Sequence, residues 1–148
     1  MAKLSDFLTP DRIKILASAD KSSALEEMFE LIASAPQIKD INAFRKAVYD
    51  RELQMSTGIG LGIAIPHGLS EAVTGLAIAA GKGANPIQFD SLDDEPVRFI
   101  FMIAVGPGQM RSYLECLAEI VTVFKNPELR AKLLAAKEPA ELYKILSS

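Results

Sequence analysis

The run from Val97 to Val105 constrains the fold of this 148-residue chain most, because all of its residues except Arg98 are apolar. A strand with apolar residues on both faces has to be covered on both faces by other elements. We therefore expect this run to form a long central strand in a sheet that lies between helices. A neighbouring strand is expected over residues 73–80, followed by a turn over residues 81–86.

The region before this strand has the spacing of two amphipathic helices. Residues 20–23 are expected to start the first helix, and Ser23 and Glu26 have the spacing of a capping box. Asn42 is a candidate cap for the second helix, in which Arg51 and Glu52 are expected to point mainly outward.

Proline marks the helices that are expected after the long strand. The first begins soon after residues 106–108, and the next two begin at Asn126-Pro127 and Glu138-Pro139. The first is expected to bury one apolar face, which consists of Leu114, Leu117, Ile120, Val121 and Phe124. Strands in the middle and helices at both ends predict an α/β fold, a single domain over residues 1–148 with a mixed β-sheet flanked by α-helices.

The segment Ser56 to Gly68 combines three alternate glycines, a short apolar run and the only histidine of the chain. Alternate glycines disfavour a helix or a well-packed strand. Residues 63–65 are expected to form a brief buried strand that ends at Pro66, because proline has no N–H for a sheet. His67 then lies where the strand ends, and Gly68 leaves space for an approaching partner. A neutral imidazole is a nucleophile near neutral pH and a good leaving group once charged, so His67 can accept and return a group.

Alternative interpretations apply to the same segment. Composition alone favours His67 as a turn residue or as a hydrogen-bonded polar side chain. A metal centre lacks ligands, since the chain has one histidine and one cysteine, Cys116. The glycines miss the dinucleotide-binding fingerprint, and no Gly-Lys-Ser/Thr follows to form a phosphate-binding loop. We therefore expect neither a metal site nor a nucleotide site here.

The segment Gly58-Ile59-Gly60-Leu61-Gly62-Ile63-Ala64-Ile65-Pro66-His67-Gly68 resembles the phosphorylation-site signature of a known family. The family comprises the enzyme IIA domains (EIIA type-2) of the fructose/mannitol and nitrogen-regulatory branch of the bacterial phosphoenolpyruvate-dependent phosphotransferase system (PTS). The resemblance runs from about the first helix to the C-terminus. It implies the fold of the fructose/mannitol IIA domains and a phosphohistidine intermediate on His67. The phosphoryl donor would be HPr or its paralogue, and the acceptor a IIB component or a regulated protein.

The resemblance also implies roles for three other residues. Arg51 lies sixteen positions before His67, the family spacing of an arginine that steadies the phosphoryl group, and its guanidinium matches phosphate oxygens. Thr57 and backbone N–H groups of residues 58–62 would assist. Tyr113 occupies the position of a second histidine found in many members, and its phenol can donate a hydrogen bond but offers no switchable charge near neutral pH. The alternatives are a solvated arginine at a helix end and a tyrosine with its hydroxyl in water.

Charge and composition limit the partners of the protein. A formal net charge of −3 argues against broad nucleic-acid binding. No uncharged apolar run approaches the ~20 residues that span a bilayer, and a single cysteine agrees with a reducing compartment. We expect a cytoplasmic phosphocarrier without a cofactor, without nucleic-acid partners and without stable membrane insertion. The alternatives are a regulatory protein-binding module of the same fold that does not transfer the group, and an unrelated α/β ligand-binding domain.

Overall fold

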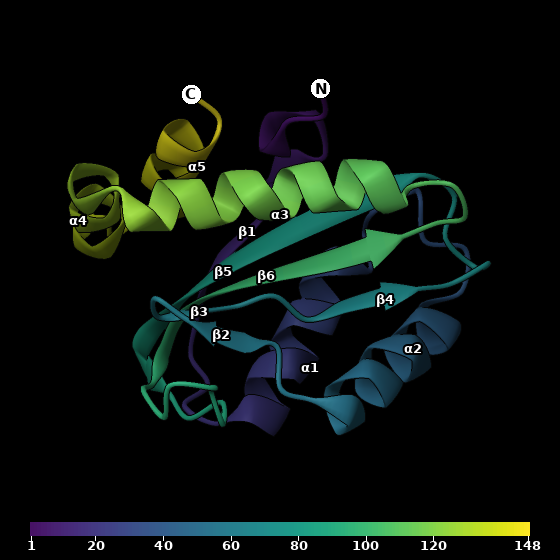
Figure 1. Cartoon of the computed structure of the whole chain (residues 1–148), viewed down its shortest axis with the longest axis horizontal. Coiled ribbons are helices and arrows are strands. Elements are labelled where there is room, and N and C mark those ends of the chain that lie inside the picture. Colours follow the sequence, from purple (N-terminus) through teal and green to yellow (C-terminus); the bar gives the residue numbers. More distant parts are fainter.

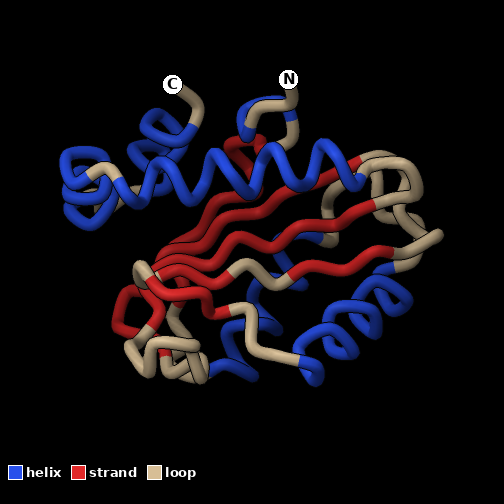
Figure 2. Tube along the Cα trace, viewed as in Figure 1, coloured by secondary structure: helices blue, strands red, loops and turns tan.

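A central sheet lies between two layers of helices in the computed structural model, which describes residues 1–148 (Figures 1 and 2). Helices α3, α4 and α5 cover one face, on the side where both termini lie, and α1 and α2 cover the other (Figure 1). The strands are β1 Leu8–Leu16, β2 Gly58–Gly60, β3 Ile63–Ala64, β4 His67–Leu69, β5 Leu76–Ile87 and β6 Val97–Val105. The helices are the 3-10 helix η1 Leu4–Asp6 and the α-helices α1 Lys21–Ile32, α2 Ile41–Gln54, α3 Met110–Lys125, α4 Pro127–Ala135 and α5 Pro139–Leu146.

The sheet has the order β1-β5-β6-β3-β2, and β4 also pairs with β6. Strand β6 runs antiparallel to β5 and parallel to β3 and β4, so the sheet is mixed. Strands β3 and β4 follow one another along the same edge of β6, where Ile63 pairs with Phe99 and His67 pairs with Ile103. The predicted α/β class with a mixed sheet between helices is confirmed.

The central strand β6 matches its predicted range, and its side chains enter two separate cores. Phe101 and Ile103 pack in the core beneath α3 and α5, whereas Ile100 and Met102 pack in the core against α1 and α2. Both faces are apolar because both are covered, as the sequence predicted. No helix in the structure is long and apolar enough to cross a membrane.

Strand β5 is longer than predicted, because residues 81–86 continue the strand instead of forming a turn. Its pairing with β6 extends through Lys82, and a register shift between Lys82 and Ile87 absorbs the irregular residues. The Lys82 ammonium also donates to the carbonyl oxygens of Leu133, Leu134 and Ala136 at the end of α4, at 3.0, 2.6 and 2.6 Å. Contacts distant in sequence therefore override the local turn pattern.

Helix α1 begins within the predicted segment 20–23, but its cap lies three residues before Ser23, and the cap of α2 lies two residues before the predicted Asn42. Asp20 caps α1 by accepting from the N–H of Ser23, and Asp40 caps α2 by accepting from the N–H groups of Asn42 and Ala43. A carboxylate at a helix N-terminus also interacts favourably with the helix dipole. The predicted start at Asn126-Pro127 is confirmed, since Asn126 caps α4.

Helix α3 is rotated relative to the prediction. Its buried side chains are Tyr113, Cys116, Ile120 and Phe124, whereas Leu114 is 52% exposed. A wide apolar stripe permits more than one rotation, and packing against β6 selects the one that places Tyr113 toward the sheet.

Candidate functional site

His67 is the first residue of β4, where it is half-buried and pairs with Ile103 of β6. The predicted brief strand does end before Pro66, but the sequence did not predict that a new strand begins at His67. Strand β3 ends at Ala64, but the carbonyl oxygen of Pro66 accepts a hydrogen bond from the N–H of Ile103 at 3.0 Å, so the chain stays beside β6 and pairing resumes at His67. The sheet thus holds the chain in place both before and after Pro66, and with it the backbone of His67.

The imidazole of His67 is held in one orientation by the main chain. Its Nδ1 lies 2.9 Å from the carbonyl oxygen of Ile65. Because a carbonyl can only accept, Nδ1 carries the hydrogen and the neutral ring keeps its lone pair on Nε2. Burial lowers the pKa of His67, and Arg51 lowers it further, against the opposing effects of the Ile65 carbonyl and of Glu52. The ring is therefore neutral at neutral pH, and its free lone pair is on Nε2.

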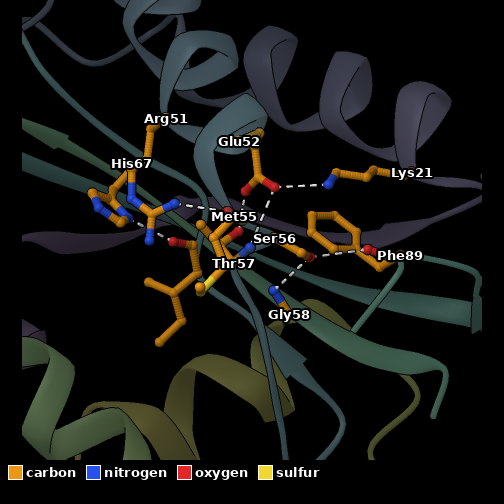
Figure 3. A network of polar contacts seen from close by, with 10 residues as sticks. Lys21, Arg51, Glu52, Met55, Ser56, Thr57, Gly58, His67 and Phe89 are labelled. Carbon is orange, nitrogen blue, oxygen red and sulfur yellow. Dashed lines mark hydrogen bonds and ion pairs between the residues drawn. The ribbon is translucent and has the colours of Figure 1, made fainter. Parts of the chain in front are cut away.

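Arg51 lies in the last turn of α2, and its guanidinium is next to the His67 ring (Figure 3). One of its nitrogens, Nη1, donates to the carbonyl oxygen of Met55 at 2.7 Å. The structure thus brings together the two residues that the family resemblance singled out. Contact between Arg51 and a phosphoryl group stays a prediction.

Gly68 allows α2 to approach the strand that carries His67. A Cβ atom at Gly68 would lie 3.1 Å from Cβ of Ala47 and 3.2 Å from Cγ2 of Val48, both on α2. Gly68 is buried, so the space left by its missing side chain is filled by this helix. The expectation from the sequence that Gly68 leaves space for an approaching partner is therefore wrong. Its missing side chain is one reason why Arg51 can reach His67.

Tyr113 packs against the other side of the site from the first turn of α3. Its ring centroid is 5.0 Å from that of His67, with an angle of 34° between the rings. The residue is only 7% exposed, and burial raises the pKa of its hydroxyl, which stays protonated at neutral pH. The tyrosine thus limits the space for the imidazole, and its contact with a phosphoryl group stays a prediction.

Thr57 is buried beneath this site, and its hydroxyl donates to the carboxylate of Glu52. A direct contact between Thr57 and a phosphoryl group stays a prediction. Glu52 itself was expected to point outward, yet its side chain is only 5% exposed. No local pattern in the sequence distinguishes Glu52 from the other charged residues of α2. It is buried because the folded chain places Thr57 and Lys21 against it.

The glycine-rich turn does not surround the imidazole. Gly62 hydrogen-bonds through its carbonyl oxygen with the N–H groups of Arg98 and Phe99, whereas His67 pairs with Ile103. Ile63 pairs with Phe99, so the two ends are four positions apart along β6, roughly 13 Å at about 3.3 Å per residue. Gly62 therefore lies far from His67, whereas Gly58 pairs with Ala64, and a contact between backbone N–H groups of residues 58–62 and a phosphoryl group stays a prediction.

A neutral, oriented imidazole beside an arginine has the chemistry to accept an anionic group. The family is given by comparison with known proteins. The model of the family described as "Phosphoenolpyruvate-dependent sugar phosphotransferase system, EIIA 2" matches residues 6–148, and the chain belongs to this family. The family predicted from the sequence is confirmed.

Individual relatives come from both branches of the family. The chain is 35% identical over 146 residues to the PTS system fructose-specific EIIABC component of Bacillus subtilis, covering 98% of this chain and only 23% of that protein's length. It is 35% identical over 128 residues to the nitrogen regulatory protein of Escherichia coli, covering 86% of this chain and 78% of that protein. The crystal structure of the nitrogen regulatory protein IIA-Ntr from Neisseria meningitidis is similar, with a TM-score of 0.84, 27% identity and coverage of 97% and 98% of the two chains.

Proposed function

We propose that this chain is a phosphocarrier in which Nε2 of His67 accepts a phosphoryl group from HPr or its paralogue. The group then passes to a IIB component or serves as a regulatory signal. The observation that carries the proposal is the hydrogen bond from Nδ1 of His67 to the carbonyl oxygen of Ile65, which leaves Nε2 as the nucleophile. Membership of the EIIA type-2 family supports the phosphotransferase role.

The transfer exchanges one P–N bond for another. The Nε2 lone pair of His67 attacks phosphorus in line while the bond to the donor imidazole breaks, and that electron pair returns to the donor ring. The Nδ1 proton stays on the ring of His67, where the Ile65 carbonyl stabilises the positive charge that the ring acquires. The exchange needs no external acid, base or redox partner, so we propose that it proceeds without a cofactor or metal.

Arg51 would stabilise the transferring group through its charge. The same positive charge that disfavours protonation of His67 favours a phosphoryl dianion on Nε2. Arg51 therefore has a favourable effect both before transfer, by keeping the ring neutral, and after transfer, by pairing with the phosphoryl oxygens. The Tyr113 hydroxyl is a candidate donor to one of these oxygens, and we retain Thr57 as an additional candidate.

A regulatory output is the second candidate, and Tyr113 is the residue that favours it. A neutral phenol beside His67 adds no switchable charge near neutral pH, which suits a carrier whose phosphorylation state is read by another protein more than one built for fast onward transfer. In either case we propose that residues 1–148 form one EIIA type-2 domain that works in the cytoplasm, with no nucleic-acid partner.

Intact-mass analysis tests the acceptor directly. The wild-type protein and His67→Ala are incubated with phosphoenolpyruvate, enzyme I and HPr, and their masses are compared under mildly alkaline conditions that preserve phosphohistidine. We expect one added phosphoryl group in the wild type only. A gain of mass in both proteins would assign the acceptor to another residue, and no gain in either with HPr or its paralogue would overturn the carrier function. Adding a IIB domain to the phosphorylated protein then separates onward transfer from a regulatory role.

A further inference from the structure

The residues beneath His67 form one continuous chain of polar contacts that runs from α1 to the imidazole ring (Figure 3). We propose that Glu52 is a positioning residue, which fixes His67 and Arg51 relative to each other through Thr57. This proposal rests on the proposed function for its consequences in phosphotransfer, but its structural content concerns the unphosphorylated protein alone.

Glu52 is the centre of this chain of contacts. Its carboxylate accepts from the hydroxyl of Thr57 and, at 3.3 Å, from the N–H of Thr57. It also forms an ion pair at 2.8 Å with Nζ of Lys21, whose ammonium lies 4.8 Å from the ring centroid of Phe89. The carboxylate of a side chain that is only 5% exposed needs such partners, because removing it from water without them is costly. These contacts in turn hold the Glu52 carboxylate in place.

Thr57 connects Glu52 with the imidazole. The carbonyl oxygen of Thr57 accepts from the N–H of Ile65 at 3.0 Å, and the carbonyl oxygen of Ile65 accepts from Nδ1 of His67 at 2.9 Å. The carbonyl group that selects the tautomer of His67 therefore belongs to a residue that Thr57 holds in place. The hydroxyl and the N–H of Thr57 both donate to the carboxylate of Glu52.

Glu52 also anchors the end of the helix that carries Arg51. The two residues are adjacent in α2, and each of them binds the segment that directly follows the helix. Arg51 donates to the carbonyl oxygen of Met55, while Glu52 holds the N–H and the hydroxyl of Thr57. The last turn of α2 and the strand segment before His67 are thereby joined at two points, so a shift of one would displace the other.

A purely stabilising role would not require this arrangement. A buried ion pair contributes little net stability relative to apolar packing of the same volume, because its desolvation offsets its attraction. Directional contacts do, however, define positions, and misplacing a catalytic group by about 1 Å can lower a rate by ~100-fold. The geometry therefore favours positioning as the contribution of Glu52, Lys21 and Thr57.

The single histidine of the chain gives a direct test by NMR of ¹⁵N-labelled imidazole, with no donor protein present. Thr57→Val keeps the shape of the side chain but removes its hydroxyl, and Thr57→Ser retains the hydroxyl. We expect His67 of the wild type to be the Nδ1–H tautomer, and Thr57→Val to give a mixture of tautomers with a pKa closer to the ordinary value. Thr57→Ser should restore most of the wild-type signature.

Two lysine variants form a matched pair that tests the ion pair of Glu52 by the same NMR measurement. Lys21→Met removes the partly buried ion pair with Glu52, and Lys46→Met removes an exposed pair with Asp50 that has the same N–O distance of 2.8 Å. Only Lys21→Met should alter the His67 signals. Phosphorylation by HPr, expressed per folded protein, should fall about tenfold in Thr57→Val and in Lys21→Met and be unchanged in Lys46→Met.

The proposal is overturned if Thr57→Val and Lys21→Met lower the melting temperature while the tautomer, the pKa of His67 and the phosphorylation rate stay as in the wild type. That outcome would make the contacts purely structural. If instead the tautomer shifts but no variant, including the wild type, is phosphorylated, the positioning role holds and the proposed function fails.

Discussion

The two ends of the edge formed by β3 and β4 are adjacent in sequence but differ in what they do. At one end, Gly60, Leu61 and Gly62 all have positive φ angles, of 94°, 59° and 75°, and they turn the chain from β2 into β3. At the other end, His67 has an ordinary strand backbone and depends on contacts from α2 and α3. The glycines thus serve the path of the backbone, while distant elements provide the chemistry.

This difference means that substitutions at the two ends should have separable effects. Changes at the His67 end should alter phosphotransfer, in some cases with little loss of stability. Changes at the glycine end should alter stability and leave the chemistry of the folded protein as it is. The predictions below follow from this contrast.

The largest effect is expected at Arg51. Arg51→Ala should lower the rate of phosphorylation by HPr by about 100-fold, the usual cost of losing one donor to a developing anion. Arg51→Lys should be intermediate, because an ammonium keeps the charge but lacks the two-pronged geometry of a guanidinium. Rapid-quench phosphorylation assays measure both rates, and thermal unfolding checks that the variants fold. A rate for Arg51→Ala within twofold of the wild type would exclude Arg51 from the site.

The same chemical change at two glycines compares the two ends directly. Gly68→Ala places a methyl group 3.1–3.2 Å from Ala47 and Val48, which should push α2 away from His67. We expect a loss of about 1–3 kcal/mol in the free energy of unfolding and a roughly tenfold lower phosphorylation rate.

Gly62→Ala is the counterpart at the other end. Its methyl group has room, with the nearest atoms 3.6 Å away on Arg130 and Arg98, but its φ of +75° is strained for alanine. The free energy of unfolding should fall by about 1–2 kcal/mol, with no change in the phosphorylation rate of the folded protein. Urea unfolding and the phosphorylation assay together decide the comparison, and a slower Gly62→Ala would contradict the separation of the two ends.

A smaller effect is expected for Tyr113→Phe, which retains the ring against His67 and removes only the hydroxyl. If that hydroxyl donates to a phosphoryl oxygen, the phosphorylated state should be destabilised by about 1 kcal/mol, or roughly fivefold in the transfer equilibrium with HPr. The equilibrium is measured from the phosphorylated fractions of both proteins. An unchanged equilibrium would limit Tyr113 to packing.

The smallest effect concerns pH. Burial and Arg51 lower the pKa of His67 below its ordinary value of 6.5, so the unfolded chain binds the proton more readily than the folded protein. The stability of the protein should therefore decrease as the pH falls below about 6.5, and the decrease should level off below the pKa of the folded state. His67→Gln should lack this component of the pH dependence in urea titrations. Arg51→Met should raise the pKa of His67 in an NMR titration, since it removes a nearby positive charge.

Local chemistry in the sequence was sufficient for much of the fold. The apolar run of β6 predicted its exact range and its coverage on both faces, because such a strand has no exposed side. Asn126-Pro127 predicted the start of α4, because the cap and the proline act within one turn. The length of β5 and the rotation of α3 could not be predicted in this way, since pairing with β6 and packing against it decide them.

Local patterns in the sequence were enough to predict the class of fold and the family, and they made His67 the candidate for carrying a group. His67 is the only histidine, and the motif around it is local in the chain. Packing between the elements sets which atoms of His67 are free and which groups surround it. The Ile65 carbonyl orients the ring, Gly68 lets α2 approach, and Glu52 is buried against Thr57 and Lys21. These contacts join residues from separate elements. Helix caps and strand periodicity can be recognised in a short stretch of sequence, but contacts of this kind cannot.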